Sequence, residues 1–511
     1  MSVAILFGMI IALLLIGVPI AVALGLSSIV FLLVLSDTSL ASIAQSFFQA
    51  MAGHYTLLAI PFFILASTFM STGGVAKRII RFSIALVGHF RGGLAIAGVF
   101  ACMMFAALSG SSPATVVAIG SIVIAGMRQV GYTKDFAAGV IANAGTLGIL
   151  IPPSIVMVVY ASATDVSVGR MFLAGVIPGL MAGTMLMLAI WVIARMRNLP
   201  KGEWKGWGEV LSSGRDAIWG LFLIIIILGG IYGGIFTPTE AAAVAAVYAF
   251  LIANFVYRDM GIFAKVAPKA GNFATIFVLG GVALGIAIWL TLGIDLPTAT
   301  LYGFGVALVL AIWDSLRKGQ MPVPVHIASD IVKMPLSVVH KDTRDTLFEA
   351  GKMTVTLMFI IANALILKHV LTDEQIPQQI TAAMLDAGFG PIMFLVIVNV
   401  ILLIGGQFME PSGLIVIVAP LVFPIAIELG IDPIHLGIIM VVNMEIGMIT
   451  PPVGLNLFVT SGVAGMPMMK VVRAALPFLA VLFVFLIMVT YIPILSTFLP
   501  TYFMGPEIIT K

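Results

Sequence analysis

The chain has 511 residues, of which 61% are hydrophobic and 9% are charged, and its mean hydropathy is +1.19. No water-soluble globular surface tolerates this composition, and the net charge of +3 is too small to indicate nucleic-acid binding. A single cysteine, Cys102, excludes an intrachain disulfide and a thiolate metal cage. Because apolar stretches long enough to cross a bilayer of about 30 Å recur along the chain, we expect an all-α polytopic membrane protein.

The first 25 residues read "MSVAILFGMIIALLLIGVPIAVALG" and have neither a basic n-region nor a cleavage pattern. We expect a retained membrane segment here rather than a signal peptide. Residues 1–56 are assigned to N-terminal scaffold helices, where scaffold means helices outside the internal repeat described next.

An internal repeat becomes visible when the sequence is shifted by 299 residues. The shift superposes Gly131 on Gly430, Gly148 on Gly447, Pro152-Pro153 on Pro451-Pro452, and Pro178 on Pro477. We interpret residues 57–194 and 353–497 as two structural repeats. The alternative is a coincidence in an apolar chain that is rich in glycine and proline.

Each repeat shows the same order of predicted elements. These are a spanning helix (57–72; 353–369), a polar arm (73–91; 370–389), an apolar hairpin (92–127; 390–428), a helix with a Pro-Pro break (135–160; 434–461) and a final span (171–194; 474–497). The hairpins are interrupted at "SGSSP" (109–113) and "MEPSG" (409–413). Their arms of about 15 residues are short for a crossing, so we expect re-entrant hairpins that enter and leave on one side.

Charged residues indicate opposite orientations for the two hairpins, since Lys and Arg accumulate in cytoplasmic loops. Basic residues flank the first hairpin: Lys77, Arg78, Arg81, Arg91, Arg128 and Lys134. The second is flanked by the acidic stretches "TDEQIPQQ" (372–379) and "ELGIDP" (428–433). Seven predicted crossings lie between the hairpins, and this odd number also inverts the second repeat. We therefore expect an inverted-topology repeat.

The connection between the repeats has two parts. Residues 195–270 are predicted to form linker scaffold helices, and Thr237-Pro238-Thr239-Glu240 fits a capping box, although a transport role for Glu240 stays open. Residues 271–340 are predicted to be an inserted helix pair followed by a cytoplasmic basic stretch, placed at the scaffold periphery. Residues 498–511 are assigned to a C-terminal tail.

The Pro-Pro pairs interrupt their helices because proline lacks an N–H donor and clashes with the preceding turn. A helix broken at mid-membrane leaves free carbonyl groups on one side, which favour a cation such as Na⁺, and free N–H groups on the other, which favour a carboxylate. We expect each hairpin tip to meet the Pro-Pro loop of its own repeat. This pattern predicts a coupled secondary carrier.

Candidate residues follow from these breaks. In the first repeat, oxygens of Ser109 and Ser111 are predicted to face the carbonyls of Gly148, Ile151 and Pro153. In the second, the stretch from Gly405 to Ser412 faces Gly447, Thr450 and Pro452. Ordinary turn chemistry is the alternative for the serines. Glu410 and Glu445, which lie at membrane depth, are either functional carboxylates or hydrogen-bonding struts.

The chain resembles the large membrane subunit of the tripartite ATP-independent periplasmic (TRAP) transporters, the DctM-like family. The resemblance rests on "SGSSPATVVAIGSI" (109–122), "AGTLGILIPPSIVMVVYA" (144–161), "GGIYGGIFTPTEAAAVA" (229–245), "LTDEQIPQQI" (371–380) and "GIIMVVNMEIGMITPPVGLNLFVTSGVAG" (437–465). It implies an elevator-type fold, sodium symport of small organic acids, no cofactor besides Na⁺, and a bacterial inner-membrane location. The implied partners are a periplasmic substrate-binding protein and a small four-helix membrane subunit.

The resemblance also implies positions for the bound groups. One sodium site maps onto Ser109, Ser111, Gly148, Ile151 and Pro153, and a second, weaker mapping gives Gly405, Met409, Gly447, Thr450 and Pro452. Substrate-site candidates are Ser112, Thr115, Asn143, Glu410, Ser412, Glu445 and Asn456. Two features depart from the family pattern: the tip "GQFMEPSG", where relatives commonly show Asp-Pro-Thr, and the insert at 271–340.

Three other functions are alternatives. A stand-alone sodium- or proton-coupled carboxylate carrier would work without a binding protein. An intramembrane enzyme would need a base near Ser111 or Ser112, and the sequence places no His or Lys next to them, so we expect no enzyme. A gated channel would not need paired helix breaks. The sequence has no Walker motif, so we do not expect ATP to be the energy source in this chain.

Overall fold

The computed structural model describes residues 2–35, 55–72, 74–264, 295–317 and 335–506, with isolated positions between these ranges. The described ranges are helical, and their extended pairing is limited to one bridge between Arg91 and Lys201. The chain divides into a large unit, residues 1–249 with 349–511, and a small unit, residues 250–348. Within the described residues, seven helices are long and apolar enough to cross a membrane, in agreement with the predicted all-α membrane protein. They are Tyr55–Thr72, Val168–Met196, Trp207–Tyr232, Pro238–Val256, Lys341–Asp373, Pro411–Glu428 and Met468–Tyr491.

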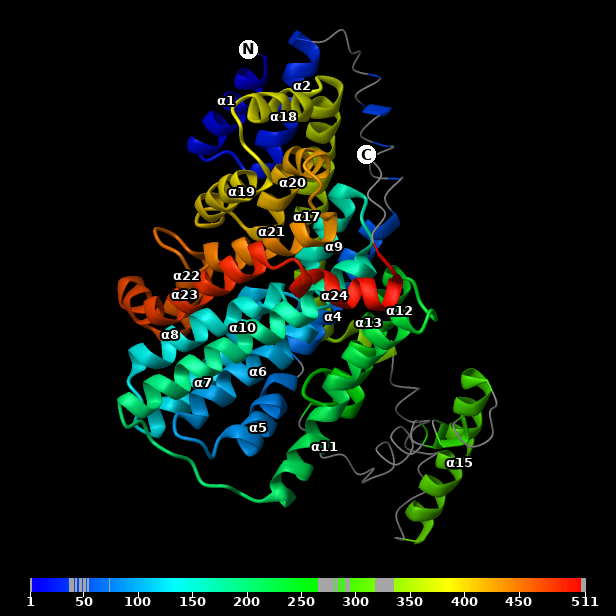
Figure 1. Cartoon of the computed structure of the whole chain (residues 1–511). Helices are drawn as coiled ribbons and strands as arrows, with labels where there is room; N and C mark the ends of the chain where they lie inside the picture. Colours follow the sequence, from blue (N-terminus) through cyan, green and yellow to red (C-terminus); the bar gives the residue numbers. More distant parts are fainter. Residues whose placement is uncertain are drawn as a thin grey trace. The chain divides into compact units, whose positions relative to one another are not determined.

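The first repeat of the large unit begins after two N-terminal helices, α1 (Ser2–Leu15) and α2 (Ile20–Leu35). Its helices are α4 (Ala59–Thr72), α5 (Val75–Val87), α6 (Gly93–Ser109), α7 (Ser112–Gln129), α8 (Lys134–Ala144), α9 (Ile155–Thr164) and α10 (Val168–Met196). Helices α6 and α7 pack on each other as the first hairpin (Figure 1). Gly110 allows the tight turn between them, because its φ of 57° is left-handed.

The second repeat follows the same order. Its helices are α17 (Lys341–Asp373), α18 (Ile376–Asp386), α19 (Pro391–Gly406), α20 (Pro411–Glu428), α21 (Pro433–Gly447), α22 (Leu455–Ala464) and α23 (Met468–Tyr491). Adding 299 to the bounds of α9 gives 454–463, one residue from the bounds of α22. The hairpin helices are 16 to 18 residues long, slightly longer than predicted.

The end of the second repeat differs from the prediction. The final span was expected over 474–497 with a tail after it, whereas α23 ends at Tyr491 and a further helix, α24 (Ile494–Met504), follows. Pro493 explains the interruption, because it cannot donate the hydrogen bond that would continue α23. The predicted tail therefore begins inside a helix.

The two repeats are packed into each other rather than side by side. Helix α8 of the first repeat lies along α23 of the second, and α9 and α7 contact α20 and α22 (Figure 1). Close approach requires glycine: a Cβ on Gly139 would lie 2.4 Å from the carbonyl oxygen of Ala474, and one on Gly437 would lie 2.5 Å from Tyr160 Cε1. Neither repeat buries its apolar faces alone.

The linker contains α11 (Trp207–Ile224), a π-helical turn (Ile225–Gly229), α12 (Gly230–Tyr232) and α13 (Pro238–Leu251). The predicted capping box is present at α13. The Thr237 N–H donates to Glu240 Oε2 at 2.8 Å, and the Glu240 N–H donates to Thr237 Oγ1 at 3.3 Å.

In the small unit, α15 (Leu296–Arg317) is the described helix of the predicted insert. Asp295 caps it by accepting from the Thr298 N–H and hydroxyl, at 3.1 and 2.8 Å, and these bonds lower the pKa of Asp295. The other helix, predicted over 273–293, lies mostly outside the described residues, as does most of the basic stretch before α17.

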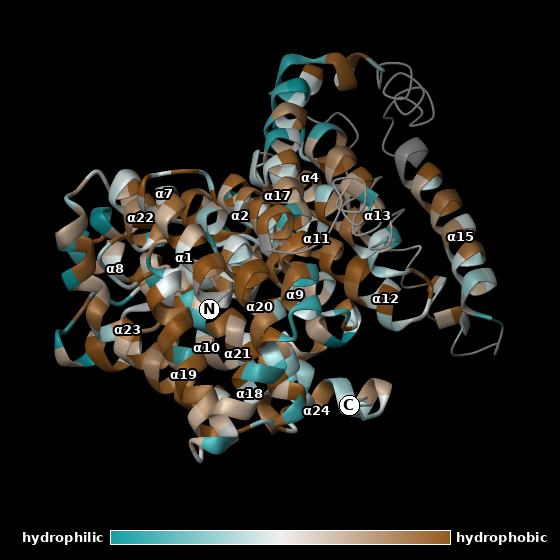
Figure 2. Cartoon of the chain, turned by 90° about the horizontal axis from the view of Figure 1, so that it is seen from above, coloured by the Kyte–Doolittle hydropathy of each residue, from teal (hydrophilic) through white to brown (hydrophobic). Residues whose placement is uncertain are grey.

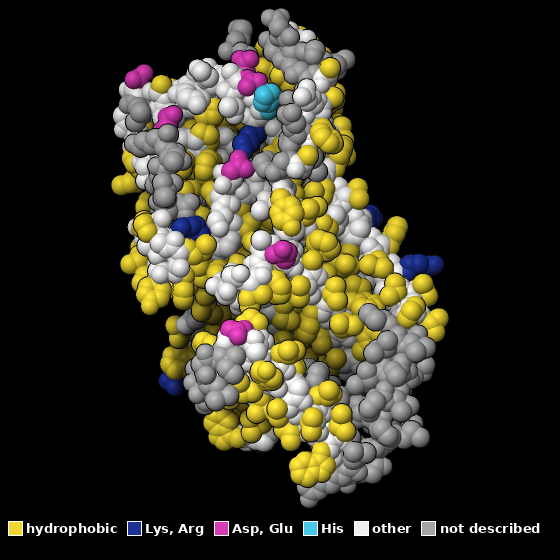
Figure 3. Space-filling view, turned by 90° about the vertical axis from the view of Figure 1, so that its right-hand side faces the viewer, with side chains coloured by type: hydrophobic (Ala, Val, Ile, Leu, Met, Phe, Trp, Pro, Cys, Tyr) yellow, Lys and Arg dark blue, Asp and Glu magenta, His cyan; other side chains and the backbone are white. Residues whose placement is uncertain are grey.

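The outer surface of these helices is apolar, as expected for contact with lipid. Hydrophobic residues lie all around helices such as α10 and α23 (Figure 2), and Leu188 and Ile487 are each more than half exposed. The face drawn in Figure 3 is covered mainly by hydrophobic side chains, with few charged ones. Such a surface is stable only in a bilayer or a detergent micelle.

Candidate functional site

The first helix break lies between α8 and α9. A short 3₁₀ turn (Gly145–Ile149) follows α8, and the chain then passes through Pro152 and Pro153 before α9 begins. The Ser154 hydroxyl joins both sides of the break: it donates to the Ile149 carbonyl at 2.6 Å and accepts from the Met157 N–H at 3.4 Å. All residues from 145 to 160 are buried. The break is thus an ordered part of the core.

The tip of the first hairpin touches this break. The Ser112 hydroxyl donates to the Thr146 carbonyl at 2.9 Å. A Cβ on Gly148 would lie 2.6 Å from the Ser111 carbonyl oxygen, and one on Gly110 would lie 2.9 Å from that of Pro153. The structure therefore brings Ser111, Gly148 and Pro153 together, as the sequence led us to expect. Their role as sodium ligands stays a prediction.

The candidate oxygens at this contact differ in availability. Ser109 Oγ lies 2.9 Å from Thr115 Oγ1, and the Thr115 N–H and hydroxyl both donate to the Ser111 carbonyl, so these groups are engaged in ordinary turn chemistry. By contrast, the Ser111 hydroxyl and the carbonyls of Gly148, Ile151 and Pro153 accept no hydrogen bond from the described residues. These four oxygens of the predicted set are therefore free to meet a cation, and their role as ligands stays a prediction.

The second break repeats the arrangement with a more open geometry. The Gly454 N–H donates to the Gln407 carbonyl at 3.0 Å, which ties the loop to the tip of the second hairpin. A Cβ on Gly447 would lie 2.7 Å from the Cα of Gly406. Unlike Pro152 and Pro153, Pro452 is exposed. The Thr450 hydroxyl donates to the Ile446 carbonyl at 2.7 Å, which leaves its lone pairs available to a cation.

The remaining candidates of the second tip have local roles. Glu410 caps α20, because its Oε2 accepts from the Gly413 N–H and its Oε1 accepts from the Ser412 hydroxyl, both at 3.0 Å. Gly405 faces Leu414, and Met409 is half-buried between the two hairpin helices. These contacts favour a structural role for Glu410 and Ser412.

Glu445 lies inside the core and contacts Thr146, the residue whose carbonyl accepts from Ser112 at the first hairpin tip. It is fully buried, and its Oε1 lies 2.8 Å from Thr146 Oγ1, which itself lies 2.7 Å from the Asn143 carbonyl. Asn143 donates to the carbonyls of Gly139 and Ala475. These contacts link helices, but Glu445 Oε2 and Asn143 Oδ1 are buried without a hydrogen-bond partner among the described residues, so both residues stay substrate-site candidates as well as struts.

Asn456, on the first turn of α22, is the substrate candidate that the structure favours most. Its side chain is fully buried, and neither its Oδ1 nor its Nδ2 has a partner among the described residues. Thr460, one turn later on the same face, also has a buried hydroxyl without a partner. Because buried polar groups are normally hydrogen-bonded, this face needs water or a ligand. Thr460 was missed from the sequence, although its spacing of four from Asn456 could have shown it.

A second missed feature is the pair of Asn399 and Asn443. The Asn443 amide donates to Asn399 Oδ1 at 2.6 Å and links α21 to the second hairpin. Both are polar residues within apolar helices, and this pattern in the sequence could have marked them as candidates for a polar contact inside the membrane.

Comparisons with known proteins identify the family. Residues 7–279 and 270–495 match the model of the tripartite ATP-independent periplasmic transporter, DctM component. The chain belongs to this family. A C4-dicarboxylate TRAP transporter large permease protein DctM from Vibrio cholerae is 66% identical over 511 residues, which is the whole of both chains. The DctM of the same description from Pseudomonas aeruginosa is 52% identical over 94% of each chain. The 2,3-diketo-L-gulonate TRAP transporter large permease protein YiaN from Escherichia coli is 32% identical over 96% of this chain and 97% of its own.

Two earlier expectations are answered by these relatives. They are named as transporter permeases, so this DctM-family chain is a membrane permease component and not an enzyme. The insert at 271–340 lies within the full-length alignment to the Vibrio cholerae protein, so it is not peculiar to this chain.

Proposed function

We propose that this chain is the large permease subunit of a sodium-driven, binding-protein-dependent uptake system for C4-dicarboxylates. The observation that carries the proposal is the 66% identity, along the entire length, to a permease named for these substrates. The relative named for 2,3-diketo-L-gulonate is only 32% identical. The higher identity to the permease named for C4-dicarboxylates therefore favours four-carbon diacids as substrates.

Sodium coupling is supported by the chemistry of the first break. The Ser111 hydroxyl and the carbonyls of Ile151 and Pro153 offer neutral oxygens, which suit a monovalent cation within the membrane. The second site is proposed around Met409, Gly447 and Thr450. The negative substrate then binds beside Asn456 at the start of α22. There the Gly454 and Asn456 N–H groups donate to the carbonyls of Gln407 and Met448, and those of Leu455 and Leu457 have no acceptor among the described residues.

An elevator movement is supported by the packing of the broken helices. Helices α7, α8 and α9 of one repeat contact α20, α22 and α23 of the other, so both helix breaks belong to one body that can move as a unit. We propose that this body carries substrate across a scaffold that contains α11 and α13. A periplasmic binding protein would deliver the substrate, and a small membrane subunit would complete the scaffold in the bacterial inner membrane.

The test is uptake by proteoliposomes that contain the chain, its small subunit and its binding protein. Succinate uptake should require external sodium and the binding protein, and ATP should not change it. Undiminished uptake with choline in place of sodium would contradict the coupling. Uptake without the binding protein would instead indicate a stand-alone carrier.

A further inference from the structure

Two adjoining cavities lie where α5 meets the connection between α10 and α11. The larger has a volume of about 220 Å³ and is lined by Lys77, Ile80, Arg81, Ile84, Ala85, Lys205 and Glu209. The smaller, of about 140 Å³, is lined by Ile84, Gly88, Leu94, Val130, Tyr132, Pro200, Gly202, Glu203 and Lys205. They share Ile84 and Lys205, and we call them together the α5 groove.

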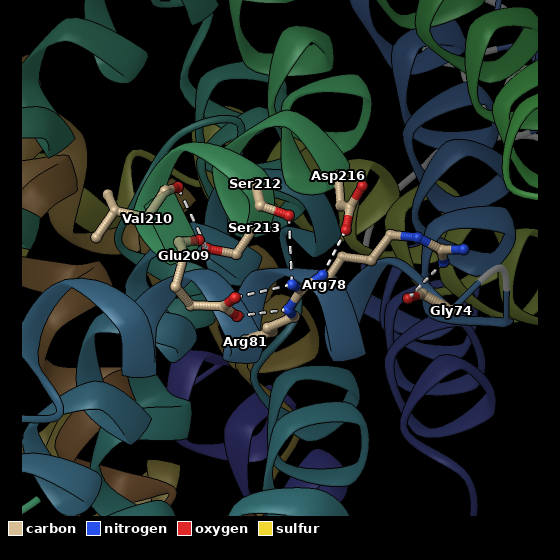
Figure 4. A network of polar contacts seen from close by, with 8 residues as sticks. All are labelled: Gly74, Arg78, Arg81, Glu209, Val210, Ser212, Ser213 and Asp216. Carbon is tan, nitrogen blue, oxygen red and sulfur yellow. Dashed lines mark hydrogen bonds and ion pairs between the residues drawn. The ribbon is translucent and has the colours of Figure 1, made fainter. Parts of the chain in front are cut away.

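Some charged side chains of the α5 groove form ion pairs and others do not. Arg81 is fully engaged: its Nε and Nη2 donate to the carboxylate of Glu209 at 2.8 and 3.1 Å, and its Nη1 donates to Asp216 at 2.6 Å (Figure 4). The bond to Glu209 is the main cause of the raised pKa of Arg81. Lys77 and Lys205 are exposed and have no ion-pair partner among the described residues. The larger cavity therefore presents two ammonium groups without an ion-pair partner among the described residues, although Lys205 is near enough to Glu209 for an electrostatic attraction to that carboxylate.

The level of the α5 groove relative to a membrane is indicated by tryptophan. Trp204 and Trp207 flank Lys205, are 43% and 69% exposed, and contact each other edge to face with ring centroids 5.5 Å apart. Exposed tryptophans of membrane proteins gather at the boundary between headgroups and acyl chains. Lys77 and Lys205 thus lie at the depth of lipid phosphates, and the sequence predicts the cytoplasmic side for this end of the first repeat.

We propose that the α5 groove binds one anionic phospholipid. Its phosphate contacts Lys77 and Lys205 in the larger cavity, which has room for a phosphoglycerol group. The first part of an acyl chain lies against Ile84, Leu94 and Val130, and the rest stays in the bilayer. The larger cavity has three basic residues and one acidic residue, and the smaller has Lys205, Glu203 and an apolar floor. An excess of basic residues beside apolar surface is the chemistry of lipid-headgroup pockets.

The experiment is native mass spectrometry of the purified full-length chain with added phosphatidylglycerol or phosphatidylcholine. We expect a preference for phosphatidylglycerol that falls about tenfold to thirtyfold in Lys77→Gln/Lys205→Gln, since each lysine near a phosphate contributes about one factor of five. The matched control is Lys352→Gln/Lys470→Gln, which removes the same charge from exposed positions elsewhere and should keep the preference.

Two further arms separate the possible ligands. Glycerol 3-phosphate at millimolar concentration should not displace the lipid, because it cannot fill the apolar part, and its displacement of the lipid would overturn the proposal in favour of a free phosphate site. Val130→Trp, at a half-exposed position that tolerates a larger side chain, should block the smaller cavity and weaken phosphatidylglycerol binding. The proposal would also be overturned if the two double variants bound phosphatidylglycerol equally well. The same holds if the wild-type chain bound phosphatidylglycerol and phosphatidylcholine equally well.

Discussion

Thr146 and Glu445 lie 299 positions apart, which is the shift that superposes the two repeats, and their side chains meet at 2.8 Å in the core. Two residues that are equivalent by the repeat can touch only where the axis relating the repeats passes between them. The axis therefore runs beside both helix breaks, and one contact joins the two halves at that point.

Removal of this contact should destabilise the protein. We expect Glu445→Ala and Thr146→Val each to lower the unfolding free energy by about 1–3 kcal/mol, because Thr146→Val leaves the buried Glu445 carboxyl without a partner and Glu445→Ala removes the link between the helices and leaves a cavity. Glu445→Gln, which can still bond to Thr146, should cost less. Unfolding in mixed micelles would measure this, with a double-mutant cycle for the pair. Strict additivity of the two single changes would show that the contact does not couple the repeats.

The Ser111 hydroxyl should affect sodium affinity more than folding. It has no partner among the described residues, so Ser111→Ala should weaken sodium activation of uptake roughly tenfold, about 1–2 kcal/mol, with little loss of stability. Ser121→Ala, an exposed change on the same helix, is the control. Ser109→Ala should do the opposite and mainly destabilise the tip, since that hydroxyl is already bonded to Thr115. An unchanged sodium titration in Ser111→Ala would exclude the side chain as a ligand.

Gly148 should tolerate no side chain. A Cβ there would lie 2.6 Å from the Ser111 carbonyl oxygen, so Gly148→Ala should separate the tip from the break and abolish sodium-dependent uptake. Gly126→Ala in the same repeat meets nothing closer than 4.0 Å and should behave as wild type. Uptake by the two variants in parallel measures the difference, and normal sodium dependence in Gly148→Ala would place the site elsewhere.

Asn456 should show a conflict between stability and function. Its amide is buried without a partner in the described residues, so Asn456→Leu should raise the unfolding free energy by about 1 kcal/mol while lowering substrate affinity at least tenfold. The contrasting change is Asn443→Leu, which removes the donor to Asn399 Oδ1 while Asn399 Nδ2 still donates to Thr490, and it should destabilise. If Asn456→Leu transports normally, the α22 face does not contact substrate.

The sequence was sufficient for features that depend on local chemistry. Proline pairs interrupt helices wherever they occur, so both breaks and the capping box at Thr237 could be predicted from a few residues each. The contact between each hairpin tip and its break followed from the need to satisfy the polar groups that a break exposes.

Features that depend on packing could not be predicted in the same way. The bonds of Arg81 to Glu209, 128 positions away, and of Asn443 to Asn399 require the relative placement of whole helices. Glu445 was recognised as either functional or a strut. Thr146 could have been proposed as its partner by applying the 299-residue shift, but the different side chains at the two positions concealed the relationship.

The interleaving of the repeats also has a consequence for biosynthesis. Helix α8 begins at Lys134 and its partner α23 at Met468, so 334 residues separate the start of one from the start of the other. At about 5–20 residues per second, translation needs roughly 17 to 67 s to cover that distance. During this interval the face of α8 around Gly139, which later packs on α23, has no permanent neighbour, and the broken end of the helix holds free carbonyl groups in a growing chain. The insertion machinery, or the other helices of the first repeat, has to shelter this face until the last span is made.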